Sequence, residues 1–93
     1  MELSTGQIVY VKRGRDAGHP FIVVAVENGY AMLADGKRRV LAKPKRKKHK
    51  HMQPTNHLAG GWIQKQESGQ MISDADIRKM LVAYRGQDGS AFE

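Results

Sequence analysis

The sequence contains no cysteine, which excludes disulfide bonds and thiolate metal ligands within this chain. Aromatic residues make up only 6% of it, and no apolar run approaches the ~18 residues of a membrane span. Catalytic patterns are missing as well, because no Ser, His and Asp spacing resembles a nucleophile elbow and no glycine-rich loop ends in Gly-Lys-Ser/Thr. These absences favour a binding protein of a reducing compartment that is not an enzyme and uses no cofactor.

Targeting signals are scarce too. The first ten residues contain no Lys or Arg, and no basic segment precedes a long apolar stretch, so neither a secretory nor an organellar leader is expected. The chain has 93 residues, which is enough for one modest domain with a thin core. We therefore expect a small cytoplasmic protein that is monomeric when free.

Positive charge is what the sequence has in excess, with a net charge of +7. Residues 1–52 contain 12 Lys and Arg against 4 Asp and Glu, a net charge of +8, whereas residues 53–93 have a net charge of −1. Clustered Lys and Arg can displace the counterions that condense on a nucleic acid. The distribution therefore favours a polyanionic partner that contacts the first part of the chain.

Two short runs of β-branched and aromatic residues predict the first strands. They are QIVYVKR at 7–13 and FIVVAVE at 21–27, and a loop with two glycines separates them. The second run leads into Asn28-Gly29, a dipeptide typical of a tight hairpin turn with positive φ at both central residues. The pattern predicts an antiparallel pair that continues into a third strand.

Further turn signals extend this pair into a meander. Strands are expected at 30–34 and 37–42, with Asp35-Gly36 as the turn between them. A last edge strand is expected from 47–53, and Pro44 suits a strand boundary because proline cannot donate to a central ladder. The four or five strands would then close into a small β-barrel or sandwich.

The remainder of the chain predicts a linker followed by a helix. Segment 53–70 is polar and contains several glycines, with a short helical or extended piece around Trp62. Residues 74–85 have the apolar spacing of an amphipathic helix. We therefore divide the chain into a barrel with a basic edge at 1–54 and a linker with a C-terminal helix at 55–93.

The start of this helix carries capping signals. Ser73 suits the N-cap, Asp76 lies in the first turn, and Ile72 and Ile77 are spaced as a hydrophobic staple. The helix is expected to end at Gly86, and the tail after it to fray. One helix face carries an apolar stripe: Ile77, Met80, Leu81 and Tyr84. The stripe either packs on the barrel or stays exposed for a partner protein.

The loop GRDAGH at 14–19 is the first candidate site. Gly14 and Gly18 fit a tight loop in which a side chain would obstruct a left-handed backbone or the close approach of another chain. Exposed backbone N–H groups, together with Arg15 and His19, can contact phosphates at short range in such a loop. An ordinary strand connection is the alternative interpretation.

The segment GQIVYVKRGRDAGHPFIVVAV resembles the KOW motif of ribosomal proteins and transcription elongation factors. The matching residues are Gly6, Val9, Val11, Gly14, Gly18 and Val23 or Val24. The fit is closest to eukaryotic and archaeal large-subunit ribosomal proteins with an amino-terminal KOW domain and to their short bacterial relatives, in which the loop commonly reads Gly-Arg-Asp-x-Gly. Ala17 and Phe21 depart from the elongation-factor branch, where lysine and glycine are common.

This resemblance covers about residues 4–56, and ISDADIRKML near the end of the chain is similar to the ending of the bacterial relatives. It implies an SH3-like barrel whose first loop meets RNA. By position it would place Arg15, Asp16 and His19 near the ligand, with ribosomal RNA as the partner and ribosomal proteins as possible neighbours.

The run KPKRKKHK at 43–50 is the second candidate site, because it contains six cations within eight residues. Such a run is usually a solvated stretch, and it can also serve as a localisation tag or bind membrane phospholipid. Here it continues the cations at 37–39 on the same predicted sheet, which favours contact with RNA phosphates. The few strand aromatics are expected in the core rather than as a stacking face: Tyr10, Phe21 and Tyr30.

A metal site is not expected. His49 and His51 would share one face of a strand, with His57 further on, but the surrounding cations repel a divalent ion and no nearby carboxylate completes the set.

The sequence therefore predicts a mainly β protein, a small SH3-like barrel with a C-terminal α-helix, that contacts structured RNA through its phosphate backbone. The candidate RNA-binding residues are Lys12, Arg13, Arg15, Asp16, His19, Lys37, Arg38, Arg39, Lys43, Lys45, Arg46, Lys47, Lys48 and Lys50, with Gly14 and Gly18 shaping the loop. Two alternatives remain at this stage: a transcription-associated KOW factor, and an adaptor that holds a protein partner through its terminal helix.

Overall fold

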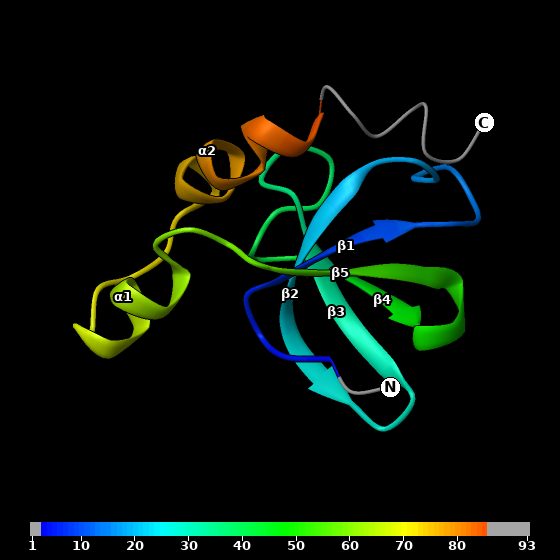
Figure 1. Cartoon of the computed structure of the whole chain (residues 1–93), viewed down its shortest axis with the longest axis horizontal. Coiled ribbons are helices and arrows are strands. Elements are labelled where there is room, and N and C mark those ends of the chain that lie inside the picture. Colours follow the sequence, from blue (N-terminus) through cyan, green and yellow to red (C-terminus); the bar gives the residue numbers. More distant parts are fainter. Residues whose placement is uncertain (1–2, 86–93) are drawn as a thin grey trace.

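A computed structural model describes residues 3–85, which form a five-stranded antiparallel sheet with helices on one side (Figure 1). The strand order is β4-β3-β2-β1-β5, so the last strand returns to pair with the first. The strands are β1 (Gln7–Val11), β2 (Pro20–Glu27), β3 (Tyr30–Ala34), β4 (Lys45–Lys48) and β5 (Met52–Leu58). The helices are the 3-10 turn η1 (His49–His51), α1 (Trp62–Glu67) and α2 (Asp74–Arg85). This is the small β-barrel-like fold with a C-terminal helix that the sequence predicts.

Both faces of the central strands are buried, which explains their continuous apolar runs. The barrel core consists of Val9, Val11, Phe21, Val23, Ala31, Leu33 and Met52. The helix-side core on the opposite face consists of Ile8, Ile22, Ala34, Ala59, Trp62, Ile77 and Leu81. Successive strand residues point to opposite faces, so neighbours such as Ile8 and Val9 belong to different cores. Burial of each large aliphatic side chain contributes roughly 1.5–3 kcal/mol.

The β2–β3 hairpin turns at Asn28-Gly29, with Glu27 paired to Tyr30 as predicted. Gly29 has a φ of 73°, but no described residue other than glycine has a positive φ. The prediction of a positive φ at Asn28 is therefore wrong. A Cβ atom makes the left-handed conformation less favourable, and in this turn only Gly29, which has no Cβ, adopts that conformation.

The strand predicted at 37–42 is wrong, because residues 35–44 form a long loop between β3 and β4. The Asp35 carboxylate accepts hydrogen bonds from the backbone N–H groups of the next residues, at 2.8–2.9 Å from Lys37, Arg38 and Arg39. A short acidic side chain that binds local backbone donors competes with ladder formation.

The fourth strand instead begins directly after Pro44, at the boundary predicted for this proline. It covers only Lys45–Lys48, and the single edge strand predicted at 47–53 is wrong. That segment is divided among the end of β4, the turn η1 and the start of β5. β4 pairs with β3 and β5 pairs with β1, so these two strands form the opposite edges of the sheet.

Part of the segment predicted as a linker belongs to the core. β5 continues to Leu58, and α1 follows with Trp62 only 4% exposed. The Trp62 indole covers Gly6, whose φ is 86°, so closely that a Cβ there would overlap the ring. The polar, glycine-containing segment thus supplies the largest side chain of the helix-side core.

The C-terminal helix has Ser73 at its start, as predicted, and Ser73 forms a capping box with Asp76. The backbone N–H of Ser73 donates to the Asp76 carboxylate at 3.0 Å, and the Asp76 N–H donates to the Ser73 hydroxyl at 3.1 Å. These reciprocal bonds satisfy donors that a helix start otherwise leaves without partners. The predicted end at Gly86 and the tail after it lie outside the described residues.

The apolar stripe of α2 is its packing face. Ile77 and Leu81 are fully buried, while Met80 and Tyr84 pack against the same core. The alternative of an exposed stripe is therefore wrong. At the end of the helix, the Tyr10 hydroxyl donates to the Tyr84 carbonyl at 3.3 Å and ties α2 to β1. Within residues 3–85, no helix has the length and apolar character needed to cross a membrane.

Candidate nucleic-acid interface

The first loop, residues 12–19 between β1 and β2, closes tightly on itself. The Gly18 N–H donates to the Val11 carbonyl at 2.8 Å, and the Ala17 N–H donates to the Gly14 carbonyl at 3.2 Å. Gly14 and Gly18 have φ values of 92° and 84°, so both adopt the left-handed conformation expected for them. This backbone leaves the side chains of Lys12, Arg13 and Arg15 exposed.

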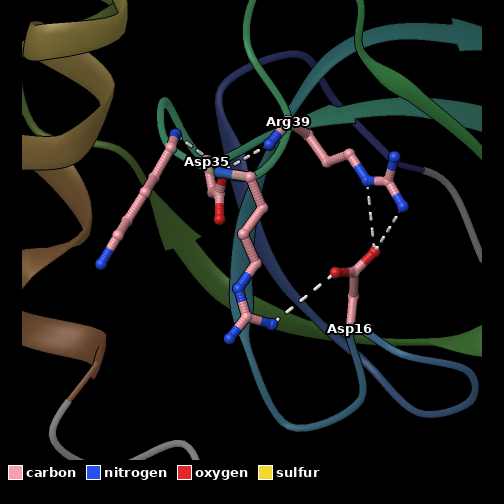
Figure 2. Close-up of polar contacts among 5 residues, drawn as sticks. Asp16, Asp35 and Arg39 are labelled. Carbon is pink, nitrogen blue, oxygen red and sulfur yellow. Dashed lines mark hydrogen bonds and ion pairs between the residues drawn. The ribbon is translucent and has the colours of Figure 1, made fainter.

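Asp16, at the centre of this loop, faces inward rather than toward solvent. Its carboxylate accepts hydrogen bonds from the Arg39 guanidinium at 3.3 and 3.4 Å, and an Arg38 nitrogen lies 3.8 Å away. Figure 2 shows the Asp16 carboxylate facing the Arg39 guanidinium. Because Asp16 is only 6% exposed, its place in the structure is that of a positioning residue that joins the first loop to the 35–44 loop.

The 35–44 loop is held from the other side by α2. The Arg78 guanidinium donates to the Gly36 carbonyl at 2.6 Å, and that of Arg85 donates to the Asp35 carbonyl at 3.2 Å. The backbone N–H of Leu41 donates to the Asp74 carboxylate at 2.8 Å. Sequence reasoning missed these anchors, because contacts across more than 30 residues leave no local pattern.

A polar hollow of about 310 Å³ lies where this loop, the first loop and α2 meet. It is lined by His19, Asp35, Lys37, Arg38 and Arg85. The structure thus brings His19 together with two of the cations predicted from the 37–39 run. Asp35 directs its carboxylate to backbone donors, so positive groups dominate the lining.

Strand β4 presents its cations on alternating faces. Arg46 stacks over the Tyr30 ring, with its guanidinium carbon 3.7 Å from the ring centroid, and donates to the Glu27 carboxylate at 3.1 Å. One face of Tyr30 is therefore covered by the protein itself. The other aromatics considered for base stacking, Tyr10 and Phe21, are buried, which confirms the prediction that they belong to the interior.

Lys45 and Lys47 lie on the opposite face of β4. They pair with Leu33 and Ala31 of the barrel core, and both side chains are half-buried. Long lysine side chains commonly cover apolar surface with their stems while their ammonium groups stay in water. The Lys47 ammonium reaches the first loop, where it would lie 3.1 Å from a Cβ placed on Gly14.

The turn η1 brings Lys50 close to the first loop. The Lys12 N–H donates to the His51 carbonyl at 2.9 Å, directly beside the pairing of Val11 with Met52. Partial burial, and then the positive charges of neighbouring side chains, lower the pKa of His51. In decreasing order of effect these neighbours are Lys50, Arg13, Lys47 and Lys48. We call Arg13, Lys47, Lys48, Lys50 and His51 the loop–turn cluster.

The candidate cations fall into two groups according to their internal partners. Among the described residues, Arg38 and Arg39 form ion pairs with Asp16, and Arg46 forms one with Glu27. Within residues 3–85 no such pair is found for Lys12, Arg13, Arg15, Lys37, Lys43, Lys45, Lys47, Lys48 or Lys50. The second group is therefore the one whose charge remains available to an external anion.

The part of the chain that the structure describes holds no group of three or more His, Cys, Asp or Glu residues able to bind a metal ion. Of the histidines considered for such a site, His49 and His51 lie in the turn η1 rather than on the predicted strand, and His57 lies near the end of β5. Nδ1 of His57 lies 3.1 Å from the Tyr84 hydroxyl, whereas Nε2 of His49 is buried at the far end of β5.

Comparison with known proteins finds no protein-family model and no curated protein that matches the chain. The KOW resemblance thus remains a prediction that rests on the residues of the loop and its flanking strands.

Proposed function

We propose that this protein binds structured RNA by its phosphate backbone, without catalysis, and that the loop–turn cluster is the centre of the contact. One observation carries the proposal. Arg13 of the first loop meets Lys47, Lys48 and Lys50 of the much later β4–η1 segment around Gly14 and His51, and none of these cations has an acidic partner among residues 3–85. A surface of this kind attracts the phosphates of a nucleic acid and releases their counterions.

The protection of a sheet edge is a competing explanation for part of this charge. Lysines on edge strands discourage the pairing of one sheet with another, and β4 is an edge strand. That explanation applies to Lys45–Lys48 alone. It does not account for Arg13 in the first loop or Lys50 in η1, which lie beside the same strand. Anion binding accounts for all of them.

The proposed RNA is structured rather than single-stranded. Recognition of single strands relies on aromatic side chains that stack on unpaired bases. Here Tyr10 and Phe21 are buried and one face of Tyr30 is occupied by Arg46, so contact with phosphates fits better than contact with bases. The resemblance to large-subunit ribosomal proteins makes ribosomal RNA in the cytoplasm the partner that we propose, and a transcription-associated KOW factor the alternative.

Neutralisation of two cluster cations tests the binding surface. We expect Lys48→Gln with Lys50→Gln to weaken binding to a ribosomal RNA fragment, because two phosphate contacts are lost. The matched control is Lys65→Gln with Lys79→Gln on the helices, which removes the same charge far from the cluster. Fluorescence anisotropy of labelled RNA should show a loss of about tenfold for the first pair and less than about twofold for the control. Equal losses would contradict a localised surface.

Co-sedimentation with ribosomal subunits, with and without ribonuclease, separates the two cellular alternatives. Release by ribonuclease from the large subunit supports ribosomal RNA as the partner. A protein found with RNA polymerase and absent from subunits would support the transcription-associated factor.

A further inference from the structure

His51 occupies a fixed position in the middle of the proposed RNA-binding surface. Its carbonyl accepts the Lys12 N–H at 2.9 Å, and the next residue, Met52, pairs with Val11. These contacts hold the turn η1 against the first loop. His51 is half-buried, so part of the residue remains accessible from outside.

The first loop, β4 and η1 all contribute positive charge around His51, whereas β1 and β5 hold no Lys, Arg, Asp or Glu. Arg13 comes from the first loop, Lys47 and Lys48 from β4, and Lys50 from η1 itself. Among the described residues, no carboxylate is found with the charged groups that act on this imidazole. His51, a side chain that can gain or lose a proton near neutral pH, thus lies among cations that have no acidic partner in the described residues.

This arrangement makes the charge of His51 dependent on an external anion. Partial burial and the neighbouring cations lower the pKa of His51 below its ordinary value of 6.5, which favours the neutral imidazole in the free protein. A phosphate among the same cations would reverse the sign of the local field and favour the imidazolium. The imidazolium in turn donates from both ring nitrogens and forms a charge-assisted hydrogen bond with a phosphate oxygen.

We propose that His51 is itself a phosphate ligand and takes up a proton when RNA binds, so that RNA affinity falls as the pH rises. This inference rests on the proposed function. Two of the other histidines do not share the arrangement, and His19 lies in the separate hollow beside Lys37, Arg38 and Arg85. His57 lies against Tyr84, and Nε2 of His49 is buried.

The direction of the effect follows from linkage. A group that holds its proton more strongly in the complex increases the affinity for RNA. This gain is complete at a pH below the pKa of the free protein, and it is lost as the pH rises through the pKa of the complex. Each unit by which RNA raises this pKa corresponds to about a tenfold difference in affinity between the two limits. The window therefore begins below the ordinary histidine value of 6.5 and extends upward to the pKa of the complex.

The test compares RNA affinity at about pH 5.5 and about pH 8, at equal ionic strength. The probe is a fully G·C-paired RNA hairpin, which carries no mismatch that would titrate. We expect wild type and the control His57→Gln to bind several-fold more tightly at the lower pH, and His51→Gln to lose most of this ratio while keeping its affinity at the higher pH. A thermal melt of each variant reports whether it is folded.

Proton uptake gives a second measurement that needs no variant. The ring-proton NMR signal of His51 should titrate at a higher pH in the complex than in the free protein. A His51→Gln variant that keeps the wild-type pH ratio, or an imidazole whose titration RNA does not move, overturns the inference while leaving RNA binding intact. If wild type binds the hairpin at neither pH, the proposed function itself is wrong.

Discussion

Asp16 illustrates how a single side chain organises the proposed interface. Asp16 lies next to the exposed Arg15 in the first loop. The Asp16 carboxylate forms ion pairs with Arg38 and Arg39 of the 35–44 loop. A nearly buried acid that hydrogen-bonds a guanidinium fixes the spacing of the loops that it joins. The same residue therefore balances one of the two arginine charges and holds both side chains beside the first loop.

Gly6 allows a prediction at the scale of one residue. Substitution with alanine would strain a backbone with a φ of 86° and drive a Cβ into the Trp62 indole. We expect the free energy of unfolding to fall by roughly 1–2 kcal/mol for the strained backbone and by a further 1–3 kcal/mol for the overlap. Urea denaturation, followed by the fluorescence of Trp62, measures the sum.

Gly29→Ala is the matched control for this experiment. Gly29 also has a left-handed backbone, with a φ of 73°, but a Cβ there would meet open space. It should lose only the roughly 1–2 kcal/mol of backbone strain. If both variants were destabilised equally, the close packing of Trp62 on Gly6 would contribute nothing.

At the scale of elements, the N-terminus of α2 is held by the pairing of Ser73 with Asp76. Hydrogen bonds from the Ser73 backbone and hydroxyl, and to a smaller extent the charges of Lys65 and Lys79, lower the pKa of Asp76 below its ordinary value of 3.8. A depressed pKa contributes stability that is present above the ordinary value and is lost as the pH falls through the folded-state value. The capping box should therefore weaken in acid.

We predict that Asp76→Asn lowers the stability of the protein at neutral pH, and that wild type and variant converge as the pH falls well below 3.8. Ser73→Ala, which removes the other half of the box, should lower stability by about 1 kcal/mol at neutral pH. Thermal melting across this pH range measures both effects. A difference between wild type and Asp76→Asn that did not change with pH would rule out the charge as its cause.

Local patterns were sufficient for elements that depend on neighbouring residues. Turn signals predicted β3 at 30–34, and capping signals with helical spacing predicted α2 at 74–85, as found. They failed at 37–42, where the Asp35 carboxylate captures the donors that a strand would need. An Asp-Gly dipeptide occurs both in hairpin turns and in loops of this kind. The hydrogen bonds of the Asp35 carboxylate to three backbone donors exist only in the folded loop, so the dipeptide alone could not indicate which of the two structures forms.

The candidate site was predictable only in part, for a related reason. Runs of Lys and Arg are visible in the sequence, but their partners are not. Nothing near Arg39 indicates that it binds Asp16, and nothing near Lys47 indicates that it reaches Gly14. The burial of Trp62 was equally hidden, since the signal for it is a glycine at position 6, more than 50 residues earlier.

For the whole molecule, the net charge of +7 and its concentration on one set of loops predict strong dependence on salt. If about five phosphates are neutralised, the logarithm of the RNA association constant should fall against the logarithm of salt concentration with a slope of about −3 to −5. Anisotropy titrations over a range of KCl concentrations measure this slope. A slope near zero would exclude a mainly electrostatic contact.

The pairing of the last strand with the first also has a consequence for the order of folding. Val9 lies opposite Pro54, so β1 has only one of its two neighbours until the chain has been synthesised as far as β5. Contacts between residues so distant in sequence form late, because the long loop between them must first be closed. Arg13 is translated early, but the turn that places it beside Lys50 depends on that closure. The emerging chain would thus carry its basic residues for some time before they form a single surface, and RNA held by that surface would favour the completed barrel over the nascent one.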